Sequence, residues 1–179
     1  MIYCFLASGF EEIEALAAVD ILRRAELDVK TVGVGSKTVV GSHGIAVTAD
    51  LQDREVDPAD MQAIILPGGM PGTLNLGKSP VVQESVAFCA ANGLLIGAIC
   101  AAPSVLGQLG VLKGKKATCF PGFETQLNCA EFTGDLVTVD GNIVTARGMG
   151  ASIEFGLALL EKIEGTQRAE LMRASLQCR

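Results

Sequence analysis

The chain has 179 residues, a length that suits one domain with a sizeable core. Hydrophobic residues make up 49% of it and aromatic residues 4%, which favours an aliphatic core of the kind found in helix-covered parallel sheets. The formal net charge of −6, with no basic cluster longer than residues 113–116, argues against nucleic-acid binding. No apolar run approaches the ~18 residues that span a membrane, and Met1 enters a strand without a basic leader, so no membrane partner is expected.

The six cysteines show no spacing typical of a metal site or a redox motif. They are Cys4, Cys89, Cys100, Cys119, Cys129 and Cys178. A disulfide framework is not expected in a core of this size, which favours reduced thiols and a cytoplasmic location. A single histidine with scattered thiols is a poor basis for a metal site, so we expect neither a metal nor a cofactor.

Taken in chain order, the predicted elements alternate between strands and helices. A strand over residues 2–6 precedes a helix over about 10–25, opened by a capping box of Ser8 and Glu11. A strand over 29–34 and a hairpin over 37–48 follow, then a buried strand over 63–66 and a helix over about 79–91, with Ser79 as its cap. A strand over 94–99 leads into a helix that ends near Gly110.

The remaining predicted elements are a short strand over 117–119, a hairpin over 136–146 that turns at Asp140-Gly141, and helices over 150–163 and 166–176. Strands that alternate with helices predict an α/β fold, doubly wound, with a mostly parallel sheet. No repeat, linker or low-complexity tract interrupts residues 1–179, so we expect a single domain.

The apolar run over residues 94–99 ends abruptly at Cys100. Its neighbours two positions away, Ala98 and Ala102, are small, as a sharp strand-to-helix corner that carries a nucleophile requires. Such a corner directs the first N–H groups of the helix at the sulfur, which lowers the pKa of the thiol and stabilises an oxyanion. A buried structural cysteine is the alternative interpretation.

Parallel sheets carry their sites beyond the carboxyl ends of the strands. Three predicted strand ends therefore share one edge, and they lead to Glu14, to Gly68-Gly69 and to Cys100. Glu14 is either a solvated first-turn acid or a partly buried carboxyl that hydrogen-bonds the sulfur. The glycine pair is either a plain turn or a place of close backbone approach. Convergence of the three on one crevice is the main functional inference.

Two other features invite functional interpretations. Residues 72–79 match the G-x-x-x-x-G-K-[ST] phosphate-loop pattern, but a P-loop begins where its strand ends, and Pro67 and Pro71 separate Gly72 from its strand. Nucleotide binding is therefore the weakest of our functional hypotheses. His43, the single histidine, lies in the predicted hairpin and is remote in sequence from the three strand ends, so a surface histidine is the simpler interpretation.

Five short motifs, each present once, are spread in order along essentially the whole chain. They are Glu11-Glu12-Ile13-Glu14, Val19-Asp20-Ile21-Leu22-Arg23-Arg24-Ala25, Leu66-Pro67-Gly68-Gly69, Ala98-Ile99-Cys100-Ala101-Ala102-Pro103, and Arg147-Gly148-Met149-Gly150 followed by Glu154-Phe155. Together they resemble the ThiJ/PfpI superfamily, in the branch that holds the parkinsonism-associated protein deglycase and the bacterial YajL-type proteins.

The resemblance implies a flavodoxin-like three-layer sandwich in one domain over residues 1–179, of the class I glutamine-amidotransferase-like type. It also implies that Cys100 is the nucleophile, bonded to a protonated Glu14. The N–H groups of Gly69 and Ala101 would form an oxyanion pocket, with Gly68 shaping the turn.

The resemblance further implies a homodimer, in which the helix over residues 10–25 carries interface residues Arg23 and Arg24. One departure concerns the residue before Pro121, where some members have a histidine and this chain has Phe120. A protease-like Cys–His–acid triad, and with it peptidase activity, is therefore not expected.

These residues lead to two hypotheses about function. The first is a cofactor-independent glyoxalase III or protein deglycase acting on methylglyoxal-type α-oxoaldehydes, free or as early adducts on protein side chains. Cys100 would add to the aldehyde, and Glu14 would move a proton between the two carbons. The alternative is an oxidative-stress sensor or redox-regulated chaperone without turnover, in which the sulfur of Cys100 stops at the sulfinate.

Overall fold

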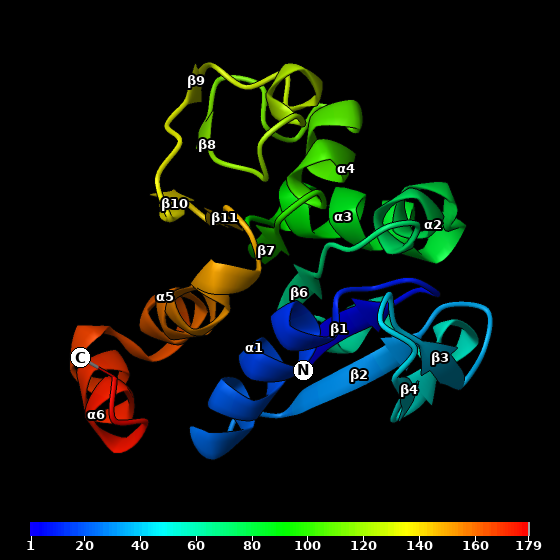
Figure 1. The fold of residues 1–179 in the computed structure, drawn as a ribbon, viewed down its shortest axis with the longest axis horizontal. Helices are drawn as coiled ribbons and strands as arrows, with labels where there is room; N and C mark the ends of the chain where they lie inside the picture. The colour runs from blue at the N-terminus through cyan, green and yellow to red at the C-terminus, as the bar shows by residue number, and fades with distance from the viewer. Residues whose placement is uncertain (179) are drawn as a thin grey trace.

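The computed structural model describes residues 1–178, and its centre is a seven-stranded sheet in the order β10-β11-β7-β6-β1-β2-β5 (Figure 1). Its strands are β1 (Ile2–Leu6), β2 (Val29–Gly33), β5 (Leu51–Gln52), β6 (Ala63–Leu66), β7 (Leu95–Ile99), β10 (Val137–Asp140) and β11 (Ile143–Ala146). Neighbouring strands run parallel except β10, which is antiparallel to β11. The predicted mostly parallel sheet is confirmed.

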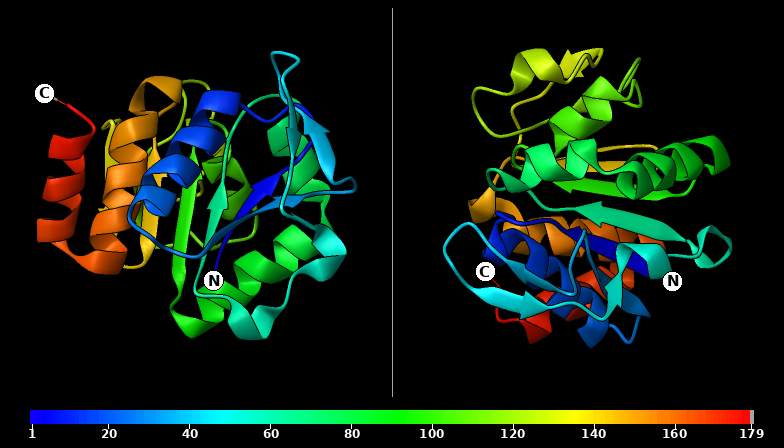
Figure 2. Two further views of the ribbon diagram at one scale, coloured as in Figure 1. Left: turned by 90° about the horizontal axis from the view of Figure 1, so that it is seen from below. Right: turned by 90° about the vertical axis from the view of Figure 1, so that its right-hand side faces the viewer.

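Helices cover both faces of this sheet, as the right-hand view of Figure 2 shows. One face carries α1 (Glu12–Arg24), α5 (Ser152–Glu164) and α6 (Thr166–Ser175), and the other carries α2 (Gly72–Lys78), α3 (Pro80–Asn92) and α4 (Pro103–Gln108). Two small strand pairs lie outside the sheet: β3 (Thr38–Val40) with β4 (Ala46–Thr48), and β8 (Lys116–Ala117) with β9 (Glu131–Phe132). The expected α/β three-layer sandwich is therefore confirmed.

The sheet separates two apolar cores, because successive side chains of a strand point to opposite faces. In the interior strand β1, Cys4 and Leu6 pack with α1 and α5, whereas Tyr3 and Phe5 pack with α2, α3 and α4. A strand that is buried on both faces has a continuous apolar sequence, which is why β1 was predictable from its residues.

Helix α5 packs tightly against β7 at Gly97. A Cβ at this position would lie 2.8 Å from Cδ2 of Leu159 and 3.0 Å from Cζ of Phe155. The strand that leads to Cys100 can therefore approach α5 only because its central residue has no side chain.

The predicted capping box at the start of α1 is wrong. The N-cap is Glu11, and its side chain caps no backbone N–H group of the helix. The two groups of Glu11 that the box would use have tertiary partners: its N–H donates to the Gly68 carbonyl (2.9 Å), and its Oε2 accepts from the Ser42 hydroxyl in the β3–β4 turn (3.0 Å). A tertiary partner has replaced the local one.

Both predicted hairpins are confirmed, and the other differences are local. The strand expected over 117–119 is β8, which pairs only with β9. The sequence did not predict α2, β5 or β9. Ser79 is the N-cap of α3, as predicted, but its hydroxyl makes no capping hydrogen bond. Among the described residues, none of the helices has the length and apolarity that crossing a membrane requires.

The phosphate-loop pattern lies in a helix. Its residues from Gly72 to Lys78 form α2, in which the Thr73 N–H donates to the Gly69 carbonyl (2.9 Å) and the Asn75 N–H to the Pro71 carbonyl (3.0 Å). A P-loop needs such N–H groups free to surround a phosphate. The nucleotide-binding hypothesis is therefore wrong in its structural premise.

We predict that Gly97→Ala lowers the free energy of unfolding by about 1–3 kcal/mol, because Leu159 and Phe155 must shift to admit the methyl group. Gly150→Ala is the matched control, since a Cβ there would have no neighbour within 4 Å. Urea unfolding of the two variants measures the difference. Equal midpoints would show that the contact of β7 with α5 is looser than described.

Candidate active site

Cys100 lies on a strained corner between β7 and α4. Its φ of 65° is in the left-handed region, which residues with side chains rarely adopt. Its N–H donates to the Ala146 carbonyl (2.9 Å), and its carbonyl accepts a hydrogen bond from the Phe120 N–H (2.8 Å). Strain that is held in place by such bonds is characteristic of functional corners. The corner predicted at Cys100 is confirmed.

Gly68, at the end of β6, joins this corner to helix α1. Its N–H donates to Oε2 of Glu14 (2.8 Å), and its carbonyl accepts from the Glu11 N–H (2.9 Å). A Cβ on Gly68 would lie 2.5 Å from Cβ of Cys100 and 2.8 Å from Oε2 of Glu14. Glycine is thus required here because the thiol and the carboxyl approach the backbone from two sides.

Two backbone N–H groups are directed at the Cys100 sulfur, from Gly69 and from Ala101. Gly69 has a φ of 87°, and a Cβ on it would overlap the backbone nitrogen of Glu11. The structure therefore brings together all five residues that the sequence analysis singled out: Cys100, Glu14, Gly68, Gly69 and Ala101.

The Glu14 side chain is completely buried. Burial raises the pKa of its carboxyl to about 7, although its contact with Cys100 and the hydrogen bond from the Gly68 N–H favour the charged form. Its second oxygen, Oε1, has no hydrogen-bond partner among the described residues. Of the two interpretations left open for Glu14, the buried carboxyl with a raised pKa is confirmed.

The expected low pKa of the Cys100 thiol is wrong for the site as it stands. Burial, followed by the charge of Glu14 beside it, raises the pKa of Cys100 to about 12, and the N–H groups of Gly69 and Ala101 only partly oppose this. Two negative charges in one buried pocket repel each other. The pair therefore carries a single negative charge above neutral pH, with one proton between sulfur and carboxylate.

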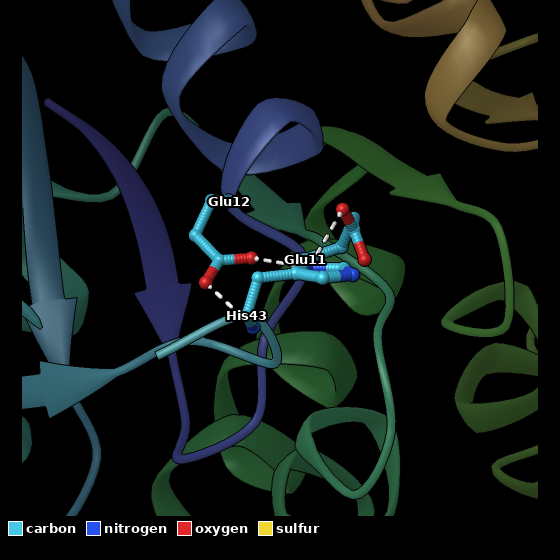
Figure 3. A group of neighbouring side chains, drawn as sticks. All are labelled: Glu11, Glu12 and His43. Atoms are coloured by element: carbon cyan, nitrogen blue, oxygen red, sulfur yellow. Dashed lines mark hydrogen bonds and ion pairs between the residues drawn. The ribbon is translucent and has the colours of Figure 1, made fainter. Parts of the chain in front are cut away.

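His43 lies away from this pair, on the turn between β3 and β4, and is bound to the first residues of α1 (Figure 3). Its Nδ1 is 3.1 Å from Glu12 Oε2 and 3.5 Å from Glu11 Oε1, and its side chain is 67% exposed. These contacts raise the pKa of His43, with the Glu12 hydrogen bond as the main cause. No contact described for His43 includes Cys100, in agreement with the expected surface histidine.

Glu12 binds the hairpin to helix α1. Its Oε1 accepts from the backbone N–H groups of His43 (2.8 Å) and Ile45 (3.4 Å). Burial disfavours the charge on Glu12, but these bonds and the imidazole lower the pKa of Glu12 to about 2. One ligand atom each of Glu11, Glu12 and His43 lie within 4.8 Å of one another, as in some metal sites. Because the carboxylate of Glu12 is already hydrogen-bonded, we interpret this cluster as a structural connection.

Residues 1–162 match the model of the DJ-1/PfpI family. The chain belongs to this family. It is 37% identical over 178 residues to protein DJ-1 homolog A of Arabidopsis thaliana, an alignment that covers 97% of this chain and 45% of that protein. The chain spans less than half the length of both Arabidopsis relatives that it matches, DJ-1 homologs A and B. The resemblance inferred from the sequence motifs is confirmed.

A relative with a named activity is the glutathione-independent glyoxalase DJR-1.2 of Caenorhabditis elegans. It is 31% identical over 160 residues, which cover 88% of this chain and 85% of that protein. Among solved structures, an oxidized DJ-1 from Toxoplasma gondii superposes with a TM-score of 0.95 at 34% identity, covering 99% of this chain and 97% of that one. The expected flavodoxin-like fold is thus confirmed.

Two contacts in and around helix α1 and the Cys100 corner were not predicted. The contact of Glu12 with His43 joins residues 31 positions apart, and no local pattern signals it. Phe120 was noted only for the histidine it replaces, whereas the structure bonds its backbone directly to Cys100. Helix α4 and strand β8 lie between Cys100 and Phe120 in the chain, so no local sequence pattern reveals this proximity.

We predict that alkylation of Cys100 by iodoacetamide accelerates through a step near pH 7, where the pair loses its first proton. Below this pH both groups are protonated and the pair is neutral. In Glu14→Gln the step disappears, because no titratable carboxyl remains beside the sulfur. Peptide mass spectrometry resolves Cys100 from the other thiols, and identical profiles for the two proteins would refute the shared proton.

Proposed function

We propose that this chain is a cofactor-independent glyoxalase, which converts α-oxoaldehydes such as methylglyoxal to 2-hydroxy acids. The observation that carries the proposal is a buried thiol beside a buried carboxyl, at Cys100 and Glu14, with the N–H groups of Gly69 and Ala101 directed at the sulfur. The glyoxalase name of the C. elegans relative supports it. In this reaction the thiol of Cys100 replaces the glutathione thiol that a glutathione-dependent glyoxalase uses.

In the first step, the Cys100 sulfur adds to the aldehyde carbon while Glu14 takes the thiol proton. The aldehyde oxygen becomes an oxyanion, which the N–H groups of Gly69 and Ala101 stabilise. Glu14 then returns the proton to this oxygen. The product is a neutral hemithioacetal, and Glu14 is again a carboxylate.

In the second step, the Glu14 carboxylate removes the proton from the carbon bonded to sulfur and delivers it to the neighbouring ketone carbon by way of an enediol, while the hydroxyl proton of the first carbon passes to the ketone oxygen. The first carbon is oxidised to a thioester and the second is reduced to an alcohol, so no external oxidant is needed. Water then hydrolyses the thioester, which releases the 2-hydroxy acid and regenerates the Cys100 thiol.

The proposal extends to early adducts of the same aldehydes on protein side chains. Such an adduct keeps the ketone beside a carbon that bears a hydroxyl group and the side-chain nitrogen. Displacement of this nitrogen by the Cys100 sulfur yields the free amine and the same hemithioacetal. The later steps are then unchanged, so a deglycase and a glyoxalase would differ only in how the substrate enters.

We predict that Cys100→Ala reduces glutathione-free formation of lactate from methylglyoxal to the uncatalysed background. Glu14→Gln reduces it by roughly 10²–10⁴-fold, since its amide cannot shuttle a proton. The matched controls are Cys178→Ser, near the end of the chain, and Glu84→Gln, exposed on α3. Equal rates for wild type and Cys100→Ala would remove the proposal.

A redox sensor is the second candidate, favoured by the same N–H groups, because they and a protonated Glu14 can also hold sulfinate oxygens. We predict that mild peroxide adds two oxygen atoms to Cys100 and none to Cys129 or Cys178. Mass spectrometry of wild type and Glu14→Ala provides the measurement. Selective oxidation of Cys100 without any aldehyde turnover would favour sensing over catalysis, and indiscriminate oxidation of all three thiols would exclude it.

A further inference from the structure

A pocket of about 410 Å³ lies at the carboxyl end of β11, beside the Cys100 corner, and its walls are mainly apolar. Its apolar side chains include Phe120, Leu136 and Met149, and Arg147 is the charged residue in its lining. This volume is within the range of small-molecule sites and exceeds what a methyl group occupies. A larger cavity, of about 590 Å³, lies at the opposite edge, where β1, β6 and β7 begin, and so has no access to the sulfur.

Both walls of the pocket are bonded to Cys100 through the backbone. On one side, the Phe120 N–H donates to the Cys100 carbonyl (2.8 Å). On the other side, the wall from Arg147 onward follows Ala146, whose carbonyl accepts the Cys100 N–H (2.9 Å). Neighbouring parallel strands lie about 4.8 Å apart, so the backbone at the start of this wall lies about one strand spacing from the backbone of Cys100.

Three large apolar side chains that line this pocket are partly exposed. Phe120 is 37% exposed, Leu136 41% and Met149 43%. Single exposed apolar residues are ordinary, but several around one concave pocket indicate that something apolar covers them. The Phe120 ring can approach the opposite wall because Gly148 has no side chain, since a Cβ there would lie 3.0 Å from Cδ2 of Phe120.

In the proposed reaction, the carbonyl oxygen that becomes an oxyanion is bound by the N–H groups of Gly69 and Ala101. The substituent on the ketone carbon must then point away from these groups and away from the carboxyl of Glu14. The pocket beside Phe120 offers it an apolar environment next to the reacting carbon. A methyl group would leave most of this volume to water, whereas an aryl or branched alkyl group would fill more of it.

We propose that this pocket is the subsite for the substrate's side group, and that the enzyme prefers α-oxoaldehydes with an aryl or branched alkyl group to methylglyoxal. Phe120 is the specificity-determining residue, with Met149 opposite it. The inference rests on the proposed glyoxalase function and adds the substrate class. Arg147 is exposed at the rim and its Nη1 lies 3.4 Å from the Gly134 carbonyl, so the interior of the pocket remains apolar.

The test compares kcat/KM for phenylglyoxal, measured as mandelate, with kcat/KM for methylglyoxal, measured as lactate, in glutathione-free initial-rate assays. We expect the wild type to favour phenylglyoxal by about tenfold or more, the scale that differences in apolar burial produce. Phe120→Ala is expected to lower this ratio about tenfold. Phe132→Ala, at an exposed phenylalanine on β9 outside the pocket, leaves the ratio unchanged.

Met149→Ala provides a second and independent test, because its side chain is 43% exposed and its truncation therefore removes little buried contact. It is expected to lower the same ratio. A wild type without preference for phenylglyoxal, or variants that lower both rates equally, would overturn the subsite. Turnover that persists in Cys100→Ala would instead overturn the glyoxalase function itself, so the two failures are distinguishable.

Discussion

The buried Glu14 carboxyl and the Cys100 thiol lie side by side, and one proton between them governs what the site can do. Neither group can be charged freely, because burial raises both pKa values and two charges would repel. In the proposed reaction, addition of the sulfur to a carbonyl is therefore joined to proton transfer to Glu14. A permanently ionised thiol, the simpler idea, would need a less buried sulfur or a neutral neighbour.

This pair depends on close approach of three chain segments, and glycine makes the approach possible. Gly68 and Gly69 let the end of β6 lie against both Cys100 and the start of α1, where any Cβ would collide. Gly97 lets α5 press against the strand that leads to Cys100. The strain at Cys100 is held by backbone bonds to Ala146 and Phe120, so the surrounding fold carries the energetic cost of the corner.

The apolar pocket beside Phe120 is, in our proposal, the feature that orients a substrate at the site. In the proposed reaction, the N–H groups of Gly69 and Ala101 would stabilise the oxyanion of a substrate, and its side group would lie toward Phe120 and Met149. On this proposal, the corner at Cys100 would perform the chemistry, and the loops after β8 and β11 would select the substrate.

The amino-acid sequence alone determined the α/β class, the parallel strands and the corner at Cys100, because buried strands and small residues around a sharp turn are visible as local sequence patterns. It also determined which residues would share one sheet edge, since parallel strands end together. Only the tertiary structure decided the proton balance of Glu14 and Cys100, because a pKa depends on burial by distant segments. Contacts between segments far apart in the chain likewise replaced the predicted capping box at Glu11 and placed the backbone of Phe120 against Cys100.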